Sequence, residues 1–406
     1  GPFLPDLFIV FISIIFLFIY KFDKDFLFRS LFFKIFVIFY CYLVCISIFS
    51  EYIFNSIKPS LTYLRFGIFT LAIVFILEKN EIFKKHFYII ICLTIGILLI
   101  DGFFQFLTGK NIFGYETNRP DRLGGLFFDE LILGSYLGKI LPIFCIFSIF
   151  NKKKVNKFYV LIFIFLTYLL IFLSGERSAF LTTTLYLVLI SPFFVNLKKG
   201  IIFFVIISLI FGILISTNKN IKSRYFDQMI AHTIPNQEQH GKNQLLPEHR
   251  GLIVSAIAIF KENILIGDGV KTFRVNCREL NFKNIDSNKV EFSDVINSDD
   301  CKIYTTSKKC STHPHNYYLQ LLSETGLVGF MFVFLTFLKL LFNYFQQVYF
   351  LFRHKEKINK ANNLILVGII VYLWPLITTG SFFNNWISSI LFLQAGLYLY
   401  SKKRID

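Results

Sequence analysis

Two arginines in this chain stand where they could bind a phosphorylated group. Arg177 follows the turn at 174–176, and Arg250 follows 247–249; each lies in the predicted first turn of a helix. A helix N-terminus has unpaired amides and the positive end of the dipole, so an arginine is misplaced there unless an anion shares the site. With an anion, guanidinium and amides form a phosphate site. The alternatives are an Arg177 that reaches lipid headgroups and a solvated or salt-bridged Arg250.

A histidine that could act as a base precedes a third helix start. His315 comes before Asn316, a suitable N-cap for a helix that begins at Tyr317. The dipole disfavours imidazolium there, so a neutral His315 could accept a hydroxyl proton beside a bound phosphate. The alternatives are an interfacial histidine and a metal ligand paired with His313. A clear third ligand is missing from the sequence, so we expect no metal and no cofactor.

These residues adjoin long apolar segments. The chain has 406 residues, of which 55% are hydrophobic and 17% charged, whereas soluble domains carry about a quarter charged residues. Its apolar blocks have the length that crosses a ~30 Å hydrocarbon core, and they do not alternate as barrel strands do. The sequence therefore predicts an all-α integral membrane protein with about eleven transmembrane helices.

The basic residues indicate orientation rather than binding to nucleic acid. The net charge is +16, but Lys and Arg gather in alternate connections between spans. Such a bias marks the cytoplasmic side. The clusters lie at 21–29, 79–85, 152–157, 198–199, 353–360 and 402–404. We therefore expect a long loop on the opposite side and no nucleic-acid partner.

The spans divide the chain into three predicted parts. These are a bundle of about eight helices at 1–216, a large extracytoplasmic loop at 217–315 and about three helices at 316–406. Eleven spans with a cytoplasmic C-terminus would put Gly1 outside. The chain does not begin with Met, so a preceding span, the twelfth, is expected if the native chain is longer.

The loop contains one clear amphipathic helix. Apolar residues at 253, 256, 257 and 260 share a face after the start at Pro247. Further on, Glu324, Gly326 and Gly329 lie in the helix that re-enters the membrane, and the two glycines would let a neighbouring helix approach closely.

Three cysteines in the loop suggest one disulfide bond. Cys277, Cys301 and Cys310 lie in a compartment where disulfides persist. We favour the pair Cys277–Cys310, which would hold the segment before His313 near the loop helix. The alternative is Cys301–Cys310, and zinc binding by these thiols is less favoured.

Four stretches together resemble a known family. The first is 101–106 with 108–114; the second is Arg122 with 125–127 and 134–137; the third is the turn at 174–178; the fourth is Arg250 with 267–269, 313–319 and 324–329. The set is similar to the bacterial O-antigen ligases and O-antigen polymerases, membrane glycosyltransferases of the C-type architecture. The fourth stretch is the most specific.

The resemblance implies a function in the bacterial inner membrane. The donor would be a glycan on undecaprenyl pyrophosphate, used on the periplasmic face, and the acceptor would be lipid A-core for a ligase or a second lipid-linked glycan for a polymerase. Arg177, Arg250 and Arg122 would bind the pyrophosphate and His315 would be the base, with His313, Asn316 and Glu324 in support.

Two rival classes remain at this stage. A lipid-linked oligosaccharide flippase would need more charges within the spans, and a membrane receptor would need no histidine at the bilayer edge. Convergence of Arg177, Arg250 and His315 on one periplasmic cavity would favour the enzyme.

Overall fold

The structure is a computed structural model that describes residues 3–19, 30–151, 156–194, 197–228, 247–282, 311–353 and 359–403. Within these ranges the chain is helical and forms no strand, apart from a single antiparallel bridge between Lys110 and Glu116. The predicted all-α fold is confirmed. The chain forms two compact units, and each is described by itself.

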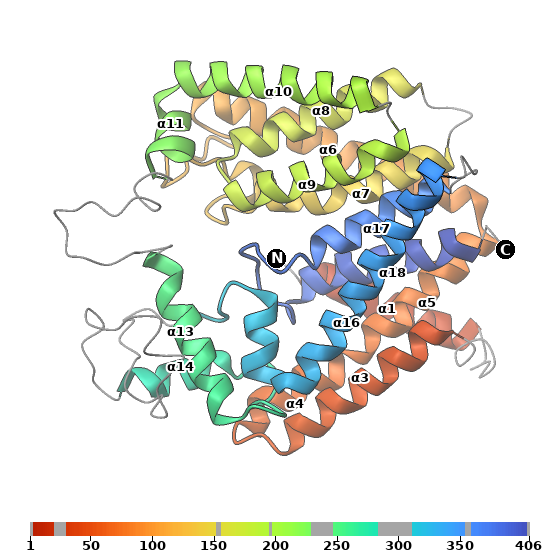
Figure 1. Ribbon diagram of the computed structural model, residues 1–406, viewed down its shortest axis with the longest axis vertical. Helices are drawn as coiled ribbons and strands as arrows, with labels where there is room; N and C mark the ends of the chain where they lie inside the picture. The colour runs from red at the N-terminus through yellow and green to blue at the C-terminus, as the bar shows by residue number, and fades with distance from the viewer. Residues whose placement is uncertain are drawn as a thin grey trace. The chain divides into compact units, whose positions relative to one another are not determined.

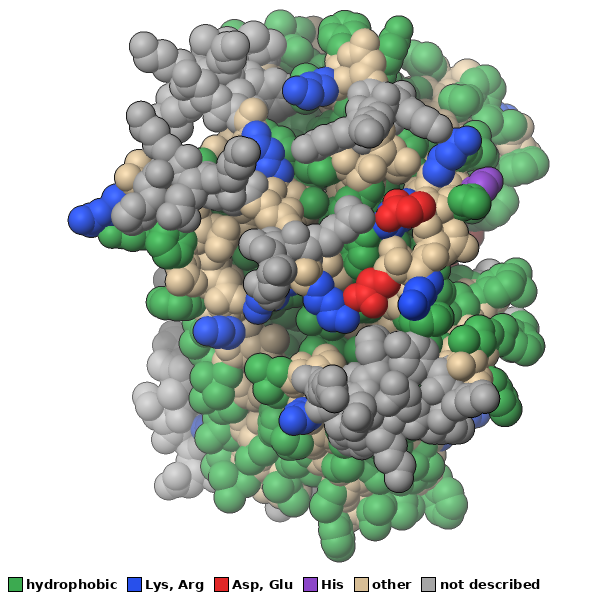
Figure 2. Space-filling model, turned by 90° about the vertical axis from the view of Figure 1, so that its right-hand side faces the viewer, with side chains coloured by type: hydrophobic (Ala, Val, Ile, Leu, Met, Phe, Trp, Pro, Cys, Tyr) green, Lys and Arg blue, Asp and Glu red, His purple; other side chains and the backbone are tan. Residues whose placement is uncertain are grey.

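Six helical segments in the described ranges are long and apolar enough to cross a membrane. They are Leu31–Ile48, Ile53–Lys79, Glu81–Thr108, Leu133–Phe150, Arg177–Phe194 and Tyr317–Arg353. Shorter apolar helices occur at Leu4–Ile19, Lys157–Leu173, Ile207–Thr217 and Lys360–Tyr372. Hydrophobic side chains form broad patches on the face drawn in Figure 2, as a lipid-exposed surface requires. The count of about eleven spans and the three-part division of the chain stay predictions.

The first unit comprises Gly1–Ile73, His232–Lys339 and Leu373–Gly396. Its helices are α1 (Phe3–Ile19), α3 (Leu31–Ile48), α4 (Ile53–Thr62), α13 (Pro247–Glu262) and α14 (Phe273–Phe282), with the first parts of α5 (Leu64–Lys79), α16 (Tyr317–Arg353) and α18 (Asn385–Lys403). An aromatic cluster joins α3, α5 and α18: the Phe392 ring contacts the rings of Phe36 and Phe66, and the Tyr63 ring contacts all three.

The amphipathic helix of the loop is present, but its buried face differs from the prediction. Helix α13 packs beside α14 (Figure 1) and buries Leu252, Ala256 and Ile259 against Phe273. Of the predicted apolar face, Ala256 is buried and the residues at 253, 257 and 260 are half-buried. The buried face of α13 is rotated relative to the predicted face, because α14 and Leu319 of α16 cover one side of the helix.

The second unit comprises Val74–Ala231, Leu340–Tyr372 and Leu397–Asp406. Its remaining helices are α6 (Glu81–Thr108), η1 (Gly125–Phe127), α7 (Leu133–Phe150), α8 (Lys157–Leu173), α9 (Arg177–Phe194), α10 (Leu197–Thr217), α11 (Lys219–Lys222), η2 (Ser223–Asp227) and α17 (Lys360–Tyr372). Helix α17 packs on both α7 and α9 and is buried from Ala361 to Tyr372. It is the centre of this unit.

Candidate active site

The turn that carries Arg177 is formed as the sequence predicts. Helix α8 ends at Leu173 and α9 begins at Arg177. Between them Gly175 has a φ of 72°, and a Cβ there would lie 2.4 Å from the backbone oxygen of Asp121. The amide of Leu123 donates to the Ser174 carbonyl at 3.2 Å. Only glycine fits this turn, because the backbone must take a left-handed conformation beneath a closely packed loop.

Glu176 stabilises the start of a neighbouring helix. Its carboxylate is buried and accepts hydrogen bonds from the amides of Gly134, at 2.7 Å, and Ser135, at 3.2 Å. These are first-turn amides of α7, which would otherwise be unpaired. Burial raises the pKa of Glu176, and the positive charge of Arg122 opposes this shift. The carboxylate is therefore engaged by α7.

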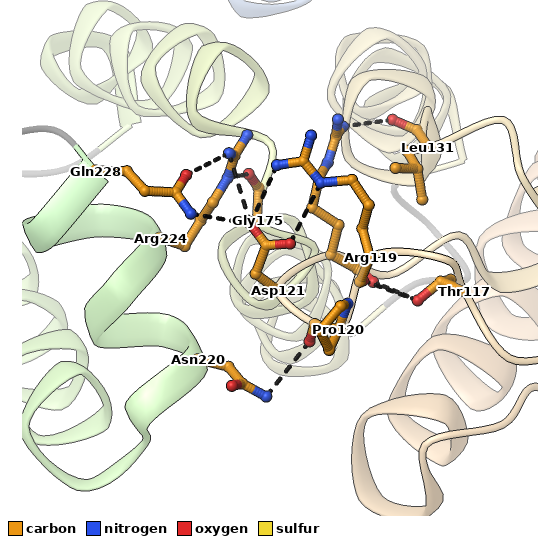
Figure 3. A network of polar contacts seen from close by, with 10 residues as sticks. Thr117, Arg119, Pro120, Asp121, Leu131, Gly175, Asn220, Arg224 and Gln228 are labelled. Atoms are coloured by element: carbon orange, nitrogen blue, oxygen red, sulfur yellow. Dashed lines mark hydrogen bonds and ion pairs between the residues drawn. The ribbon is translucent and has the colours of Figure 1, made fainter. Parts of the chain in front are cut away.

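Arginines gather around this turn (Figure 3). Arg224 donates from Nε to the Gly175 carbonyl and from Nη1 to Gln228 Oε1, each at 2.8 Å. Its guanidinium lies 3.7 Å from Asp121 Oδ2, and Arg119 pairs with the same carboxylate at 3.4 Å. Burial, together with the charges of Arg177 and Arg122, lowers the pKa of Arg224 to about 10.

Arg122 and Arg177, two of the three arginines predicted from the sequence, have fewer polar partners than Arg224. Arg122 donates from Nη2 to the Leu131 carbonyl at 2.7 Å, and its buried Nε has no hydrogen-bond partner within the described residues. Burial lowers the pKa of Arg122. Arg177 is half-buried, and in the described ranges it forms neither a hydrogen bond nor an ion pair. Two of the four arginines, Arg119 and Arg224, pair with Asp121, and the described ranges show no ion pair for Arg122 or Arg177. Such an excess of positive charge suits a polyanion.

The segment after α10 holds Arg224 in place. Asn218 Oδ1 caps α11 by accepting from the amides of Asn220 and Ile221. In η2 the Tyr225 ring stacks on Phe172 with centroids 4.6 Å apart, and its hydroxyl donates to the Phe172 carbonyl at 2.8 Å. Arg224 is therefore fixed against the end of α8 by the residue that follows it.

His315 lies in an unusual backbone conformation in the first unit. Its φ is 55°, a left-handed value that is uncommon for residues other than glycine. The His315 carbonyl accepts from the Thr379 amide at 2.7 Å, and Nε2 lies 3.4 Å from Ser311 Oγ. The His313 ring is 4.3 Å away. Burial, with His315 nearby, lowers the pKa of His313 to about 4.

Asn316 is the predicted N-cap, and the structure confirms it. Its Oδ1 accepts from the amides of Tyr318, at 2.9 Å, and Leu319, at 3.1 Å. Its Nδ2 donates to the Pro375 carbonyl at 2.8 Å. The side chain therefore begins α16 and ties that start to the segment before α18, which orients His315 next to it.

Glu324 connects the membrane helix to the loop helices. The fully buried carboxylate accepts from the Lys271 amide at 2.9 Å, the Phe273 amide at 3.4 Å and Gln320 Nε2 at 3.1 Å. Phe273 is the first residue of α14, so Glu324 caps that helix from α16. Glu324 therefore supports the fold by holding the start of α14 against α16.

One of the two glycines of the re-entering helix has a different role from the one predicted, and the other has the predicted role. Gly326 has non-helical angles, φ 61° and ψ −169°, and interrupts α16. A Cβ at Gly326 would lie 2.4 Å from the backbone of Leu265, so a loop rather than a helix approaches this glycine. At Gly329 a Cβ would lie 3.2 Å from the Tyr42 ring of α3, which is the close helix approach that was expected.

The structure brings some predicted residues together and leaves others apart. Arg122 and Arg177 lie in one cluster of the second unit, and His315 lies with His313 in the first. Arg250 lies in the first turn of α13, as predicted, but its side chain is outside the described residues. Convergence of these residues on one cavity stays a prediction.

The described residues test only part of the disulfide prediction. Cys277 is buried and disulfide-bonded. Cys301 and Cys310 lie outside the described residues, so the choice of partner stays a prediction.

Sequence reasoning missed Arg224 and Gln320. Arg224 lies within the predicted loop at 217–315 and was not singled out, although it comes soon after a span and precedes an aromatic residue, Tyr225. Gln320 donates to Glu324 and to Ser381 Oγ, and accepts from the Phe382 amide at 2.8 Å. Its spacing of four residues before Glu324 could have indicated a shared helix face.

Comparison with known proteins adds the family. No curated protein matches the chain. Residues 160–334 match a family model described as O-antigen ligase. The match includes Arg177, Arg224, Arg250 and His315, while Arg122 lies outside it. It supports a membrane glycosyltransferase-like enzyme of O-antigen processing, with lipid-linked glycan and lipid acceptor substrates in general. The match of residues 160–334 to this model supports the O-antigen ligase and polymerase superfamily that the sequence resembles.

Proposed function

We propose that the protein transfers a glycan from undecaprenyl pyrophosphate to the sugar hydroxyl of lipid A-core. The reaction takes place on the periplasmic face of the bacterial inner membrane. Arg177, Arg250 and Arg122 bind the pyrophosphate, and His315 is the base. The alternative within the same superfamily is O-antigen polymerisation, in which a second lipid-linked glycan is the acceptor.

One observation carries this proposal, namely the arginine cluster around the Gly175 turn. Arg119 and Arg224 share Asp121, whereas Arg177 has no acidic partner in the described ranges. Such uncompensated charge at the start of a helix is unfavourable by itself, and a pyrophosphate would relieve it. A flippase would require charges along the spans, and the cluster is confined to the connections of 119–122, 175–177 and 224.

The proposed chemistry follows from these charges. His315 accepts the proton of the acceptor hydroxyl, and the resulting oxygen nucleophile attacks the anomeric carbon of the donor with inversion. The bond from that carbon to the pyrophosphate oxygen breaks, and undecaprenyl pyrophosphate leaves. The arginines stabilise the charge that develops on the leaving group. A neutral imidazole is required, so protonation of His315 would stop the reaction.

Reconstitution tests the proposal directly. Purified protein in vesicles is given a lipid-linked glycan and, in separate reactions, lipid A-core or more of the lipid-linked glycan. Glycan transferred to lipid A-core supports the ligase, and longer lipid-linked chains support the polymerase. Binding of the donor without either product, in protein that is folded, would contradict both.

A further inference from the structure

Three consecutive large aliphatic residues are exposed in the connection between α13 and α14. Ile264, Leu265 and Ile266 have 50%, 64% and 45% of their surface exposed. Their backbone is nevertheless held: the Ile264 carbonyl accepts from the Leu327 amide at 2.8 Å, and the Leu265 carbonyl accepts from the Val328 amide at 3.2 Å. The side chains are exposed because the backbone is fixed in this orientation, not because the segment lacks contacts.

The residues that hold this segment belong to two candidate membrane spans. Leu327 and Val328 lie in α16, just after the break at Gly326. The Tyr42 hydroxyl of α3 donates to the Thr325 carbonyl at 2.6 Å and lies 3.4 Å from the Ile266 carbonyl. Tyr42 precedes the end of α3 at Ile48 by about 9 Å of helix. Helical side chains lean toward the N-terminus of their helix, so the Tyr42 hydroxyl does not reach toward the C-terminal end of α3 at Ile48. The segment therefore lies alongside α3, below its end.

The exposed apolar surface continues from this segment along α16. Leu327 and Val328 are each 39% exposed, followed by Leu335 at 54% and Leu338 at 41%. Val328, Leu335 and Leu338 are spaced by seven and three residues, so they share one face of the helix. In a membrane span such a face contacts lipid.

Polar residues border the segment on both sides. Asn263 Nδ2 donates to Asp268 Oδ1 at 2.8 Å and closes the turn at its base. Glu262 and Lys271 are exposed just beyond it. An apolar tip with a charged border is the pattern of a segment that enters the acyl region while its flanks stay among headgroups.

We propose that the segment 264–266 is a membrane anchor whose side chains lie among lipid acyl chains. The anchor fixes the α13–α14 connection at the bilayer boundary. If the proposed function holds, it also keeps Arg250 of α13 at the level where a lipid-linked pyrophosphate enters, but the anchor itself does not depend on that function.

Fluorescence quenching by brominated lipid tests the anchor. The chain has two tryptophans, so Trp374→Phe and Trp386→Phe give a background without tryptophan. Leu265→Trp in this background is reconstituted in phosphatidylcholine vesicles with and without bromine on the acyl chains. We expect quenching within about twofold of that for Leu335→Trp, because bromine quenches on contact. Glu262→Trp, at an exposed position at the end of α13, should be quenched several-fold less.

The result that overturns the proposal is equally specific. If Leu265→Trp is quenched no more than Glu262→Trp while Leu335→Trp is quenched, the segment does not contact acyl chains. Emission that changes with the ratio of protein to lipid, and not with bromine, would assign the surface to a second copy of the chain instead. Ile264→Trp is a second reporter should Leu265→Trp not fold. The readout involves no glycan transfer, so it is independent of the proposed reaction.

Discussion

The carboxylate of Glu324 accepts a hydrogen bond from the backbone amide of Lys271 at 2.9 Å. This contact joins residues 53 positions apart in the sequence, one in a membrane helix and one in a connection between loop helices. The same carboxylate caps α14 through Phe273. The loop is thereby attached to the membrane helix by a buried group, and several consequences of this attachment can be measured.

Glu324→Ala should destabilise the protein by about 1–3 kcal/mol, because it leaves the buried Phe273 amide and the partly buried Lys271 amide without an acceptor. Glu324→Gln, which keeps one oxygen, should cost less. Thermal unfolding of the purified variants in detergent measures the difference. Equal stability of Glu324→Ala and the unaltered protein would mean that these hydrogen bonds are replaced by water.

Gly326→Ala should destabilise the protein more than an ordinary glycine substitution. The φ of 61° is strained for alanine, and the new Cβ would lie 2.4 Å from the Leu265 backbone. The matched control is Gly96→Ala in α6, where a Cβ meets nothing within 4 Å. Alanine there should leave the unfolding temperature unchanged or raise it. If both variants unfold at the same temperature, the break in α16 is not required by the fold.

His315 should be tested with two substitutions, because its backbone is left-handed. Asparagine tolerates this conformation, so His315→Asn removes the base with little strain. His315→Asn and His315→Ala should both lower the rate of glycan transfer by about 10² to 10⁴, as loss of a general base does. Donor binding should be retained. Near-normal transfer by folded His315→Asn would remove His315 from the chemistry and direct attention to His313.

Arg177→Ala and Arg250→Ala should weaken donor binding as well as turnover, and lysine should restore function only in part, because it lacks the bidentate fork.

Arg224→Gln should lower donor affinity by about 10- to 100-fold, because it removes the charged hydrogen bond to the Gly175 carbonyl that holds the turn before Arg177, and such a bond contributes about 1.5–3 kcal/mol. The control is Lys219→Gln, which removes an exposed positive charge in α11, outside the cluster. Equal loss in Arg224→Gln and Lys219→Gln would indicate a general charge effect, not a site.

His313 should make stability depend on pH. Its pKa is lowered from 6.5 to about 4 by burial and by His315. Between these values the unfolded chain binds a proton that the folded chain does not, so this contribution is complete above pH 6.5 and is lost as the pH falls toward about 4. His313→Asn should flatten the fall in unfolding temperature across that window. His86→Asn, at an exposed position in α6, should leave it unchanged.

Much of the fold could be inferred from the sequence because the membrane imposes a simple rule. Apolar blocks of sufficient length must be helices, since backbone groups in lipid have no water to bind. Helix starts were also readable: Arg177 opens α9 after the Gly175 turn, and Asn316 caps α16. These features depend on residues close together in the chain, which is why local pattern was enough.

Tertiary structure decided the rest, because it depends on contacts between distant segments. Arg224 is linked to Gly175 across 49 positions, and no local pattern shows that it belongs with Arg177. The break at Gly326 exists because the backbone of Leu265 packs against it, although the sequence around it is that of a continuous helix. The buried face of α13 was likewise set by α14 and Leu319. The sequence by itself determined which segments are helical and where they begin. Packing between segments determined which charged side chains lie together and where a helix is interrupted.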